Sequence, residues 1–474
     1  MSHPVYETVM GLEVHVQLLT QTKLFSSAPT AFGAAPNSQA CEVDLALPGT
    51  LPVLNKKAVE LAIKFGLAVS AKIHPESVFA RKHYFYPDLP KGYQISQMDH
   101  PIVQDGKLEL DTGKTIRIQR AHLEEDAGKS IHDAHKTLTA LDFNRAGTPL
   151  LEIVTDPDFR STEEVISYLK KLHHLVRYLG VSDGNMQEGS FRADVNLSIR
   201  KKGEKTYGTR VEIKNLNSFK FIERAIEVET ERQIRAVETG EKLVQETRLF
   251  DPDLDETRSM RSKETAQDYR YFPDPDLLPV SVDSAWIQAV EAALPEMPWV
   301  RIERYKTEHE LNGEDIDVLM QNLDTSNYFE DTLRLSGDAK RSANWIIGEI
   351  LPRLHEANLR FKDCPISPEN LAQLIQKIQE NILSSKTAKI AFGHLWNQAG
   401  TLDDIIQREN LAQVSDASAL KQHIDELFEK FPAQIQELRE GKDKVMGFLL
   451  GQVMKASGGK VNPAEVQKLI RERV

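Results

Sequence analysis

Two residues near the start of the chain could act together in chemistry. The stretch from Gly11 to Val16 reads Gly-Leu-Glu-Val-His-Val, and its alternating apolar residues predict a β-strand. Because side chains alternate across a strand, Glu13 and His15 then project from the same face. A carboxylate and an imidazole on one face form a pair that a reaction can use. The alternative is a half-buried strand whose polar face meets solvent or an internal hydrogen-bond partner.

Four later clusters of polar residues lie on predicted strands or at strand ends. Each offers a carboxylate beside Val, Ile or Leu, and three of them also carry a cation. Four such strands in one domain predict a shared polar face lined with carboxylates. The clusters are His122-Leu-Glu-Glu-Asp-Ala-Gly-Lys129, Leu151-Glu-Ile153, Arg192-Ala-Asp-Val-Asn196 and Glu212-Ile-Lys-Asn215.

The predicted carboxylate face needs positive charge, because closely packed carboxylates repel one another unless they are protonated or neutralised. Hard oxygen ligands with one imidazole suit Mg²⁺ or Mn²⁺ better than Zn²⁺, which favours sulfur and several histidines. The alternative is a network of structural ion pairs with Lys129, Arg192 and Lys214. A metal with flanking cations suits phosphoryl transfer and would equally serve metal-dependent hydrolysis.

The common nucleotide-binding and hydrolase signatures are absent from the sequence. It contains no Gly-x-x-x-x-Gly-Lys-Ser/Thr loop, no Gly-x-Gly-x-x-Gly after the first strand, no His-Glu-x-x-His and no Gly-x-Ser-x-Gly. The stretch from Arg81 to Asp88, Arg-Lys-His-Tyr-Phe-Tyr-Pro-Asp, instead places cations beside three aromatic rings in a predicted loop. Such a loop could stack on a base or an adenosine and contact phosphates, or it could pack on the core.

The composition describes a soluble globular protein of two or three domains. The 474 residues are 40% hydrophobic, and the net charge of -12 disfavours bulk binding to nucleic acid but leaves room for a local basic patch. The two cysteines, Cys41 and Cys364, suit a reducing cytoplasm. No apolar run approaches the roughly 20 residues that span a bilayer, and residues 1–8 do not read as a signal peptide. We therefore expect a cytoplasmic protein without a membrane partner.

Short strands and two clear helices are predicted for the first part of the chain. One helix runs from Ser161 to Gly180, with Glu164 completing a capping box, and the second runs from Ser218 to Thr239. The prolines of Tyr271 to Pro279 exclude regular structure there. The predicted strands span residues 9–17, 114–122, 150–154, 193–200 and 209–214.

The fold class predicted from this pattern is α+β, with the helices concentrated in the second half. We expect residues 1–294 to form a domain on a largely antiparallel sheet, residues 295–408 an all-α domain, and residues 409–474 a small all-α tail. Breaks between helices are expected near Gly337, at residues 365–368 and at Gly400. A helix within residues 442–460 interleaves lysines with apolar residues, so it could meet RNA phosphates or be an ordinary solvated face.

Taken in order, these motifs resemble the GatB/GatE family, to which the B subunits of bacterial aspartyl/glutamyl-tRNA amidotransferases belong. The resemblance covers essentially the whole chain, and nine motifs in order make it specific. It implies a cradle-shaped catalytic domain, a helical domain and a YqeY-like tail that binds tRNA. Besides the stretches quoted above, it is carried by residues 94–97, 147–154, 188–196, 212–219, 268–276 and 447–457.

The resemblance also implies an activity. A GatB-like protein activates the side-chain carboxylate of Glu-tRNA(Gln) or Asp-tRNA(Asn) with ATP and Mg²⁺, or with Mn²⁺ in its place, and ammonia then displaces phosphate. The implied partners are the amidase subunit GatA, the small subunit GatC and the misacylated tRNA, and the misacylating synthetase is a further candidate. From the residues alone, a metal-dependent phosphohydrolase and a tRNA-binding scaffold with structural carboxylates stay open as alternatives.

The site residues follow from the matched motifs and from charge. The implied metal ligands are Glu13, His15, Glu125 and Glu152. The residues assigned to the catalytic site or its surroundings are Glu124, Glu125, Lys129, Asp194 and Glu212. Charge and position assign Lys82, Arg192 and Lys214, with Lys129 as a further candidate, either to stabilisation of the ATP phosphates or to the polarity of the ammonia channel. Many family members carry Cys-x-x-Cys where this chain has Cys41-Glu-Val-Asp44, which argues against a zinc site.

Overall fold

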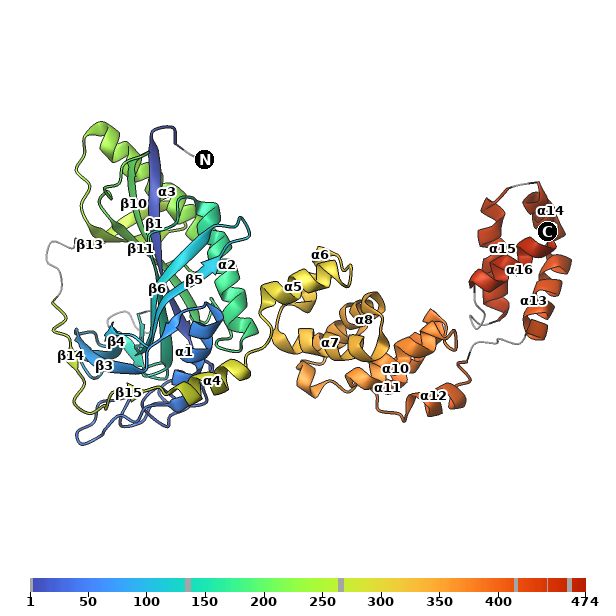
Figure 1. The fold of residues 1–474 in the computed structure, drawn as a ribbon, viewed down its shortest axis with the longest axis horizontal. Helices are drawn as coiled ribbons and strands as arrows, with labels where there is room; N and C mark the ends of the chain where they lie inside the picture. Colours follow the sequence, from blue (N-terminus) through green and yellow to red (C-terminus); the bar gives the residue numbers. More distant parts are fainter. Residues whose placement is uncertain (1–2, 133–137, 263–267, 413–416, 441, 458–462) are drawn as a thin grey trace. The chain divides into compact units, whose positions relative to one another are not determined.

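The computed structural model describes residues 3–132, 138–262, 268–412, 417–440, 442–457 and 463–474. The chain divides into two units, Met1–Pro298 and Trp299–Val474, and each is described by itself (Figure 1). The first unit combines a large sheet with helices, and the described part of the second is helical. The predicted α+β class with a largely antiparallel sheet is confirmed. The domain boundaries at residues 294 and 408 stay predictions.

A sheet of thirteen strands organises the first unit. Its main path runs β13-β12-β11-β10-β1-β9-β6-β4-β3-β14, so that β1 lies between β10 and β9. Among the described strand pairs only β11 and β12 run parallel. The central strands are β1 (Tyr6–Gln17), β6 (Thr115–Glu125), β9 (Pro149–Thr155), β10 (Phe191–Lys201) and β11 (Val211–Lys214).

The remaining strands extend the sheet beyond this centre. The strands β2 to β5 lie outside the sequence prediction. In β4 the reason is that polar residues such as Gln94, Ser96 and Gln97 are buried on both faces, so the strand lacks an alternating pattern. A separate ribbon pairs β7 (Lys129–Ile131) with β8 (Ala140–Asp142). The other strands are β2 (Lys72–Ile73), β3 (Glu76–His83), β4 (Tyr93–His100), β5 (Val103–Glu109), β12 (Glu246–Asp251), β13 (Glu256–Ser262), β14 (Phe272–Pro273) and β15 (Val280–Ser281).

The two faces of β1 differ as the alternation predicts. Leu12, Val14 and Val16 are buried, and between them Glu13 and His15 point to the other face. The apolar face is large enough to hold helices against the sheet, since burial of each such side chain contributes about 1.5–3 kcal/mol. The helices of this unit are α1 (Lys56–Ala68), α2 (Thr162–Tyr178), α3 (Phe219–Thr239) and α4 (Ser284–Ala292).

Both predicted helices are present, with one difference in capping. The Ser161 side chain accepts the Glu164 N–H at the start of α2, but the Glu164 carboxylate accepts the N–H of Arg160, so the reciprocal bond of a capping box is not made. The helices α1 and α4 also lie in this region, in addition to the two that the sequence predicted. Eight of the thirteen residues of α1 are buried, which hides the helical period in its sequence.

The segment around the clustered prolines also differs from its prediction. Phe272 and Pro273 form the short strand β14, in which Phe272 pairs with Arg81 of β3. Such pairing is possible because a proline tolerates a sheet edge. The same pairing shows that Arg81, Lys82 and His83 end a strand rather than belonging to a loop.

The second unit begins with a series of mostly short helices. All three predicted breaks between helices are present. Gly337 ends α7 in the left-handed conformation, Pro368 opens α10 behind the Ser367 cap, and Gly400 lies between α11 and α12. The helices are α5 (Pro298–Thr307), α6 (Gly313–Leu319), α7 (Leu323–Ser336), α8 (Ala339–Trp345), α9 (Leu351–Glu356), α10 (Pro368–Gln379), α11 (Ser385–Trp396) and α12 (Leu402–Arg408), with a π-helical turn at Ile346–Ile350 and a 3₁₀ turn at Phe361–Asp363.

The last four helices share an apolar core of their own, which includes Ile424, Leu449 and Ile470. The predicted lysine-bearing helix is α15, which buries Met446 and Val453. These helices are α13 (Ala417–Lys430), α14 (Pro432–Arg439), α15 (Lys444–Ala456) and α16 (Pro463–Arg473). None of the described helices of the chain has the length and apolar content needed to cross a bilayer.

Candidate active site

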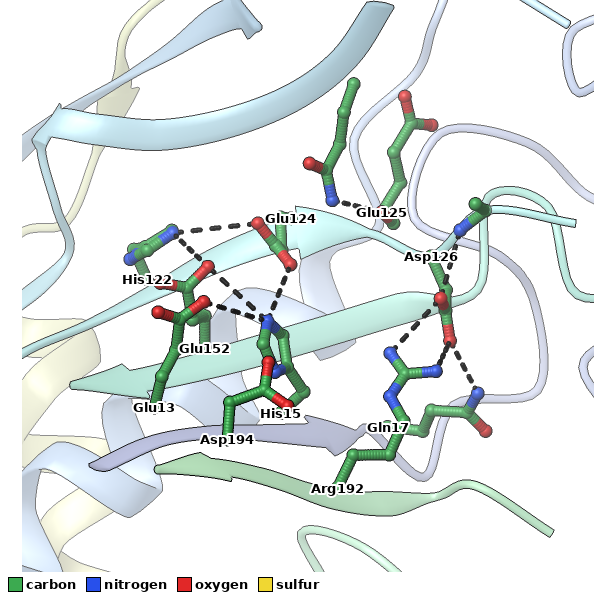
Figure 2. Close-up of polar contacts among 12 residues, drawn as sticks. Glu13, His15, Gln17, His122, Glu124, Glu125, Asp126, Glu152, Arg192 and Asp194 are labelled. Carbon is green, nitrogen blue, oxygen red and sulfur yellow. Dashed lines mark hydrogen bonds and ion pairs between the residues drawn. The ribbon is translucent and has the colours of Figure 1, made fainter. Parts of the chain in front are cut away.

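Three ionisable side chains lie side by side on neighbouring strands at the centre of the sheet. Strand β9 lies between β1 and β6, and Glu152 is directly opposite His15 on one side and His122 on the other. Directly opposed residues share a face of the sheet. The three side chains therefore converge with those of Glu13 and Glu124 (Figure 2).

The two imidazoles of this cluster share the same carboxylates. His15 Nε2 lies 3.6 Å from Glu13 Oε1, 3.7 Å from Glu124 Oε1 and 3.6 Å from Glu152 Oε2. His122 Nε2 lies 3.7 Å from Glu124 Oε2 and 3.5 Å from Glu152 Oε2. Glu124, Glu152 and His122 are all buried. We call these five residues the carboxylate cluster.

The electrostatics of the carboxylate cluster favour charged histidines. Burial lowers the pKa of His15, but its bond to Glu152 and the surrounding negative charges outweigh this and raise the pKa to about 9. The pKa of His122 is also raised to about 9, since the charge of Glu152 and bonds to Glu124 and Glu152 outweigh burial. Burial raises the pKa of Glu152, yet the two histidines hold it well below its usual range. Burial and the charge of Glu152 raise the pKa of Glu13.

The donor atoms of the carboxylate cluster fit a hard divalent cation. They form two overlapping groups, Glu13 with His15 and Glu152, and His122 with Glu124 and Glu152, and within each group the donor atoms lie within 4.8 Å of one another. Carboxylate oxygens with imidazole nitrogen suit Mg²⁺ or Mn²⁺. His122 Nδ1 is buried and has no hydrogen-bond partner in the described part of the chain. A bound ion would replace protons as the neutralising charge.

A cavity of about 600 Å³ is lined by residues of β3 and the segment after it, of β11, β12 and β13, and of the segment before β14. This volume suits a small-molecule ligand. Two lysines line the cavity. The Lys82 Nζ lies 5.2 Å from the centre of the Tyr269 ring. Burial lowers the pKa of Lys82, but the charges of Glu124 and other groups outweigh burial, so the pKa is raised overall. The lining residues are Lys82, His83, Tyr84, Phe85, Tyr86, Lys214, Thr247, Met260, Asp268, Tyr269 and Arg270.

Lys214 connects the cavity with two further acids. Its Nζ lies 2.5 Å from Asp194 Oδ2 and 3.0 Å from Glu212 Oε1. Burial lowers the pKa of Lys214, but these two carboxylates raise it overall. Asp194 is itself opposite Glu13 in the pairing of β10 with β1, so the cavity wall adjoins the carboxylate cluster.

A second polar group continues the same face of the sheet. Asp126 accepts hydrogen bonds from Arg192 at 3.1 and 3.2 Å and from Gln17 at 2.8 Å (Figure 2). The Nε of Arg145 lies 3.8 Å from Asp126 Oδ2. Burial raises the pKa of Asp126, but the two arginines outweigh it and lower the pKa overall. The Asp126 charge is therefore neutralised within the protein.

Comparison with known proteins identifies the family of the chain. Residues 8–288 match the GatB/GatE catalytic domain, and residues 327–474 match the GatB domain designated Yqey. The chain belongs to the GatB/GatE family. It is 54% identical over 474 residues, 99% of each chain, to the B subunit of the aspartyl/glutamyl-tRNA(Asn/Gln) amidotransferase of Thioalkalivibrio sulfidiphilus.

Two further relatives carry the same name. The protein of Coxiella burnetii is 54% identical over 475 residues, which cover 99% of this chain and all of the relative. That of Alkalilimnicola ehrlichii is 55% identical over 474 residues, or 99% of each chain. The likeness thus extends over the sheet unit and the helical unit alike. Since the name denotes one of several subunits, these relatives belong to a multi-subunit amidotransferase.

The structure places one of the four metal ligands inferred from the GatB/GatE motifs apart from the other three. Glu125 follows Glu124 on β6 and so points to the opposite face (Figure 2). There it is 2% exposed, lies 2.5 Å from Lys91 Nζ and accepts the Ile95 N–H at 3.1 Å. Glu124, predicted as a less central member of the site, occupies the place expected for Glu125. The other three predicted ligands, Glu13, His15 and Glu152, lie together.

The remaining predicted residues fall into three places. Asp194 and Glu212 hold Lys214 at the cavity, and Lys82 lines the same cavity. Arg192 binds Asp126 rather than lining the cavity. Lys129 is exposed on the ribbon strand β7, away from the central sheet.

His122 is the main site residue that the sequence assignment left out, although its motif was recognised. It precedes Glu124 by two residues, so a strict application of strand alternation would have placed both on one face. No alternation pattern of this kind marked Thr247 or Tyr269, which line the cavity, as site residues. At the position of the Cys-x-x-Cys motif, the Asp44 carboxylate lies buried, 3.1 Å from Lys23 Nζ and 2.9 Å from Ser26 Oγ.

Proposed function

We propose that this chain is the subunit that activates the side-chain carboxylate of Glu-tRNA(Gln), Asp-tRNA(Asn) or both with ATP and then amidates it. The observation that carries the proposal is the cavity with Lys82 and Lys214 beside the carboxylate cluster. The name of the relatives supplies the substrate class.

The reaction balances as two displacements. A side-chain carboxylate oxygen attacks the γ-phosphorus of ATP, an O–P bond forms, the bond to the bridging oxygen breaks, and ADP leaves. Ammonia then attacks the acyl carbon, the C–O bond to phosphate breaks, and the nitrogen loses one proton. Phosphorylation is needed because a carboxylate is a poor acyl donor, and positioning with charge stabilisation supplies most of the catalysis in such transfers.

Positive charge in the cavity would act on the phosphates. The raised pKa values of Lys82 and Lys214 keep both side chains charged at neutral pH, so both can stabilise phosphate oxygens from the cavity wall. Glu13, His15, Glu124 and Glu152 would hold Mg²⁺ or Mn²⁺, with His122 beside them. The bound ion supplies neutralisation of ATP and acyl-phosphate oxygens.

The aromatic residues of the cavity would receive an adenine. Tyr84, Phe85 and Tyr269 line it, and Phe85 is 91% exposed, so its ring is open for stacking. Base stacking on an aromatic ring contributes about 1–3 kcal/mol and tolerates any base. The adenosine of ATP and the terminal adenosine of the tRNA both meet this requirement.

Ammonia must come from elsewhere, because the sequence has no amidase-type Ser and Lys signature. We propose that a GatA-type amidase subunit supplies it and that a GatC-type subunit completes the complex. The misacylating synthetase is a further candidate partner.

The test is conversion of labelled substrate by the reconstituted complex. Glu-tRNA(Gln) and Asp-tRNA(Asn) are each incubated with ATP, MgCl₂ and glutamine, and the amino acid released from the tRNA is separated by chromatography. We expect glutamine or asparagine on the tRNA with stoichiometric ADP. ATP loss that does not depend on tRNA would support a phosphohydrolase instead.

Deletion of residues 409–474 tests the division of labour along the chain. The four tail helices have their own core, so their removal should leave the sheet unit folded. We expect the affinity for tRNA to fall about tenfold through the loss of basic contacts, while the Mg²⁺ affinity stays unchanged in a titration without tRNA. A truncated chain that no longer binds Mg²⁺ would contradict this assignment.

A further inference from the structure

A buried acid far along the sheet from the carboxylate cluster has no part in the chemistry above. Glu229 lies on α3 and is fully buried. Its Oε1 accepts hydrogen bonds from Arg232 at 2.7 Å and Gln233 at 2.8 Å. Its Oε2 accepts from Arg232 at 2.9 Å and from Thr257 Oγ1 at 2.8 Å. A buried carboxylate with four donated hydrogen bonds is held in one geometry.

Glu229 ties α3 to the hairpin formed by β12 and β13. Thr257 belongs to β13, and Arg248 of β12 places its Nε 3.5 Å from Glu229 Oε2. Arg248 Nε also donates to Thr257 Oγ1 at 2.9 Å, and a second guanidinium nitrogen donates to the Thr257 carbonyl at 2.5 Å. One carboxylate thus fixes both strands of the hairpin against the helix.

The other face of the same hairpin forms part of the cavity. Thr247 precedes Arg248 and so points to the opposite face, and a β-bulge between the two residues interrupts the pairing with β13. Thr247 Oγ1 donates to Glu212 Oε2 at 2.8 Å, and Glu212 Oε1 lies 3.0 Å from Lys214 Nζ. Thr247, Met260 and Lys214 all line the cavity.

These contacts make a continuous connection from Glu229 to Lys214. The hairpin joins the rest of the sheet through four residue pairs between β12 and the short strand β11. Without Glu229, Arg248 and Arg232 would keep their charges, because guanidinium groups do not deprotonate in proteins. Arg248 would keep only the Glu246 carboxylate, 2.6 Å from its Nη1, and Arg232 would lose the two bonds that it donates to Glu229. Both guanidinium groups would therefore move toward water.

We propose that Glu229 is a positioning residue, which holds Lys214 at the cavity through the β12–β13 hairpin. The inference deepens the proposed function and rests on it only for the use of Lys214 as a phosphate contact. The position of Lys214 itself can be measured without substrate, so the two claims fail separately.

The deciding experiment is competitive labelling of lysines in the full chain with limiting acetic anhydride, read by mass spectrometry. Exposed Lys129 serves as the internal reference. In Glu229→Gln we expect Lys214 to react about tenfold faster relative to Lys129, because the loss of one pKa unit on separation from Asp194 and Glu212 raises the neutral fraction tenfold. An unchanged ratio would overturn the inference.

Three controls separate positioning from general loosening. Glu227→Gln, on the exposed face of the same helix and 2.9 Å from Arg224, should leave the ratio unchanged. Thr257→Val keeps the shape of the side chain and removes the hydrogen bond to Glu229. It should raise the ratio of Lys214 to Lys129 labelling less than Glu229→Gln does. It replaces Glu229→Gln as the test variant if that variant folds poorly. Wild-type chain in enough urea to match the lost stability should keep Lys214 slow. Fast labelling there would mean that Glu229 is only structural.

Kinetics of the complete complex then test the use of Lys214. Glu229→Gln should raise KM for ATP about fivefold and change kcat less than twofold, as expected when uniform binding is lost. Faster labelling with unchanged KM would uphold the positioning of Lys214 and refute its role as a phosphate contact.

Discussion

The sheet unit contains two groups of carboxylates, and the negative charge of each group is neutralised in a different way. In the carboxylate cluster, the positive charge beside Glu124 and Glu152 comes from His15 and His122. In the group around Glu229, it comes from Arg232 and Arg248. In both groups the carboxylates have positively charged partners. Imidazoles can lose that charge by deprotonation, whereas guanidinium groups cannot.

The difference separates a binding site from a structural network. A metal ion can take the place of two imidazole protons, since neutral imidazole is a ligand and the displaced protons go to solvent. No ion can displace the charge of an arginine. Burial of acids is therefore a weak indicator of function, and the nature of the counter-charge is the better one.

The largest effect should follow from removing the carboxylate that the two histidines share. Glu152→Gln keeps the shape and leaves both metal-ligand groups incomplete. We expect the formation of amidated tRNA by the complex to fall about 100- to 1,000-fold, the cost of losing a preorganised charge in an active site. Glu246→Gln, which removes the carboxylate 2.6 Å from Arg248 Nη1 in the group around Glu229, should cost less than about threefold. Equal losses in both variants would erase the distinction.

The next test compares neighbours on opposite faces of β6. Glu124→Gln should lower the Mn²⁺ affinity, measured by calorimetry, about 100-fold. Glu125→Gln should leave that affinity within about threefold and instead lower the urea midpoint of the sheet unit, since it leaves the largely buried Lys91 without its partner. If Glu125→Gln loses the metal and Glu124→Gln retains it, the ligand inferred from the motif was right after all.

The neighbouring pair also shows what the sequence could and could not predict. Alternation along β1 placed Glu13 and His15 on one face without any knowledge of partners. The choice between Glu124 and Glu125 required the register of β6 against β9, which depends on pairing between residues about 30 apart in the chain. His122 differs in this respect, because alternation along β6 already places it on the same face as Glu124.

Contacts between segments far apart in the chain lay beyond the sequence for the same reason. Arg192 looked available for phosphate, and only the fold brings it to Asp126, 66 residues earlier. Lys129 shares a motif with the site yet leaves the sheet after Glu125. Glu229 sits in a charged helix whose pattern reads as a solvated surface, because the burying hairpin follows only at β12.

The third prediction concerns pH. With pKa values of about 9, His15 and His122 are protonated at pH 7 in the metal-free chain, so Mg²⁺ must displace protons. Because two imidazole protons are displaced, the Mg²⁺ affinity should rise by up to about 100-fold per pH unit from pH 7 upward and level off above pH 9. Calorimetry in buffers of different ionisation enthalpy measures the released protons, and an affinity that does not change with pH would show that the imidazoles hold no displaceable charge.

The smallest and most selective test is stability without metal. A histidine with a pKa raised above its unfolded value of about 6.5 stabilises the fold below that pH, and the contribution is lost as pH rises through about 9. At pH 9, Glu152→Gln should therefore cost less than about 1 kcal/mol of unfolding free energy, since the histidines shed their protons. Glu229→Ala should cost about 3–5 kcal/mol at pH 7 and at pH 9 alike, because the arginines stay charged. Urea unfolding of the sheet unit at the two pH values measures both. A Glu229→Ala cost that disappeared at pH 9 would mean that the charge beside Glu229 is as removable as that beside Glu152.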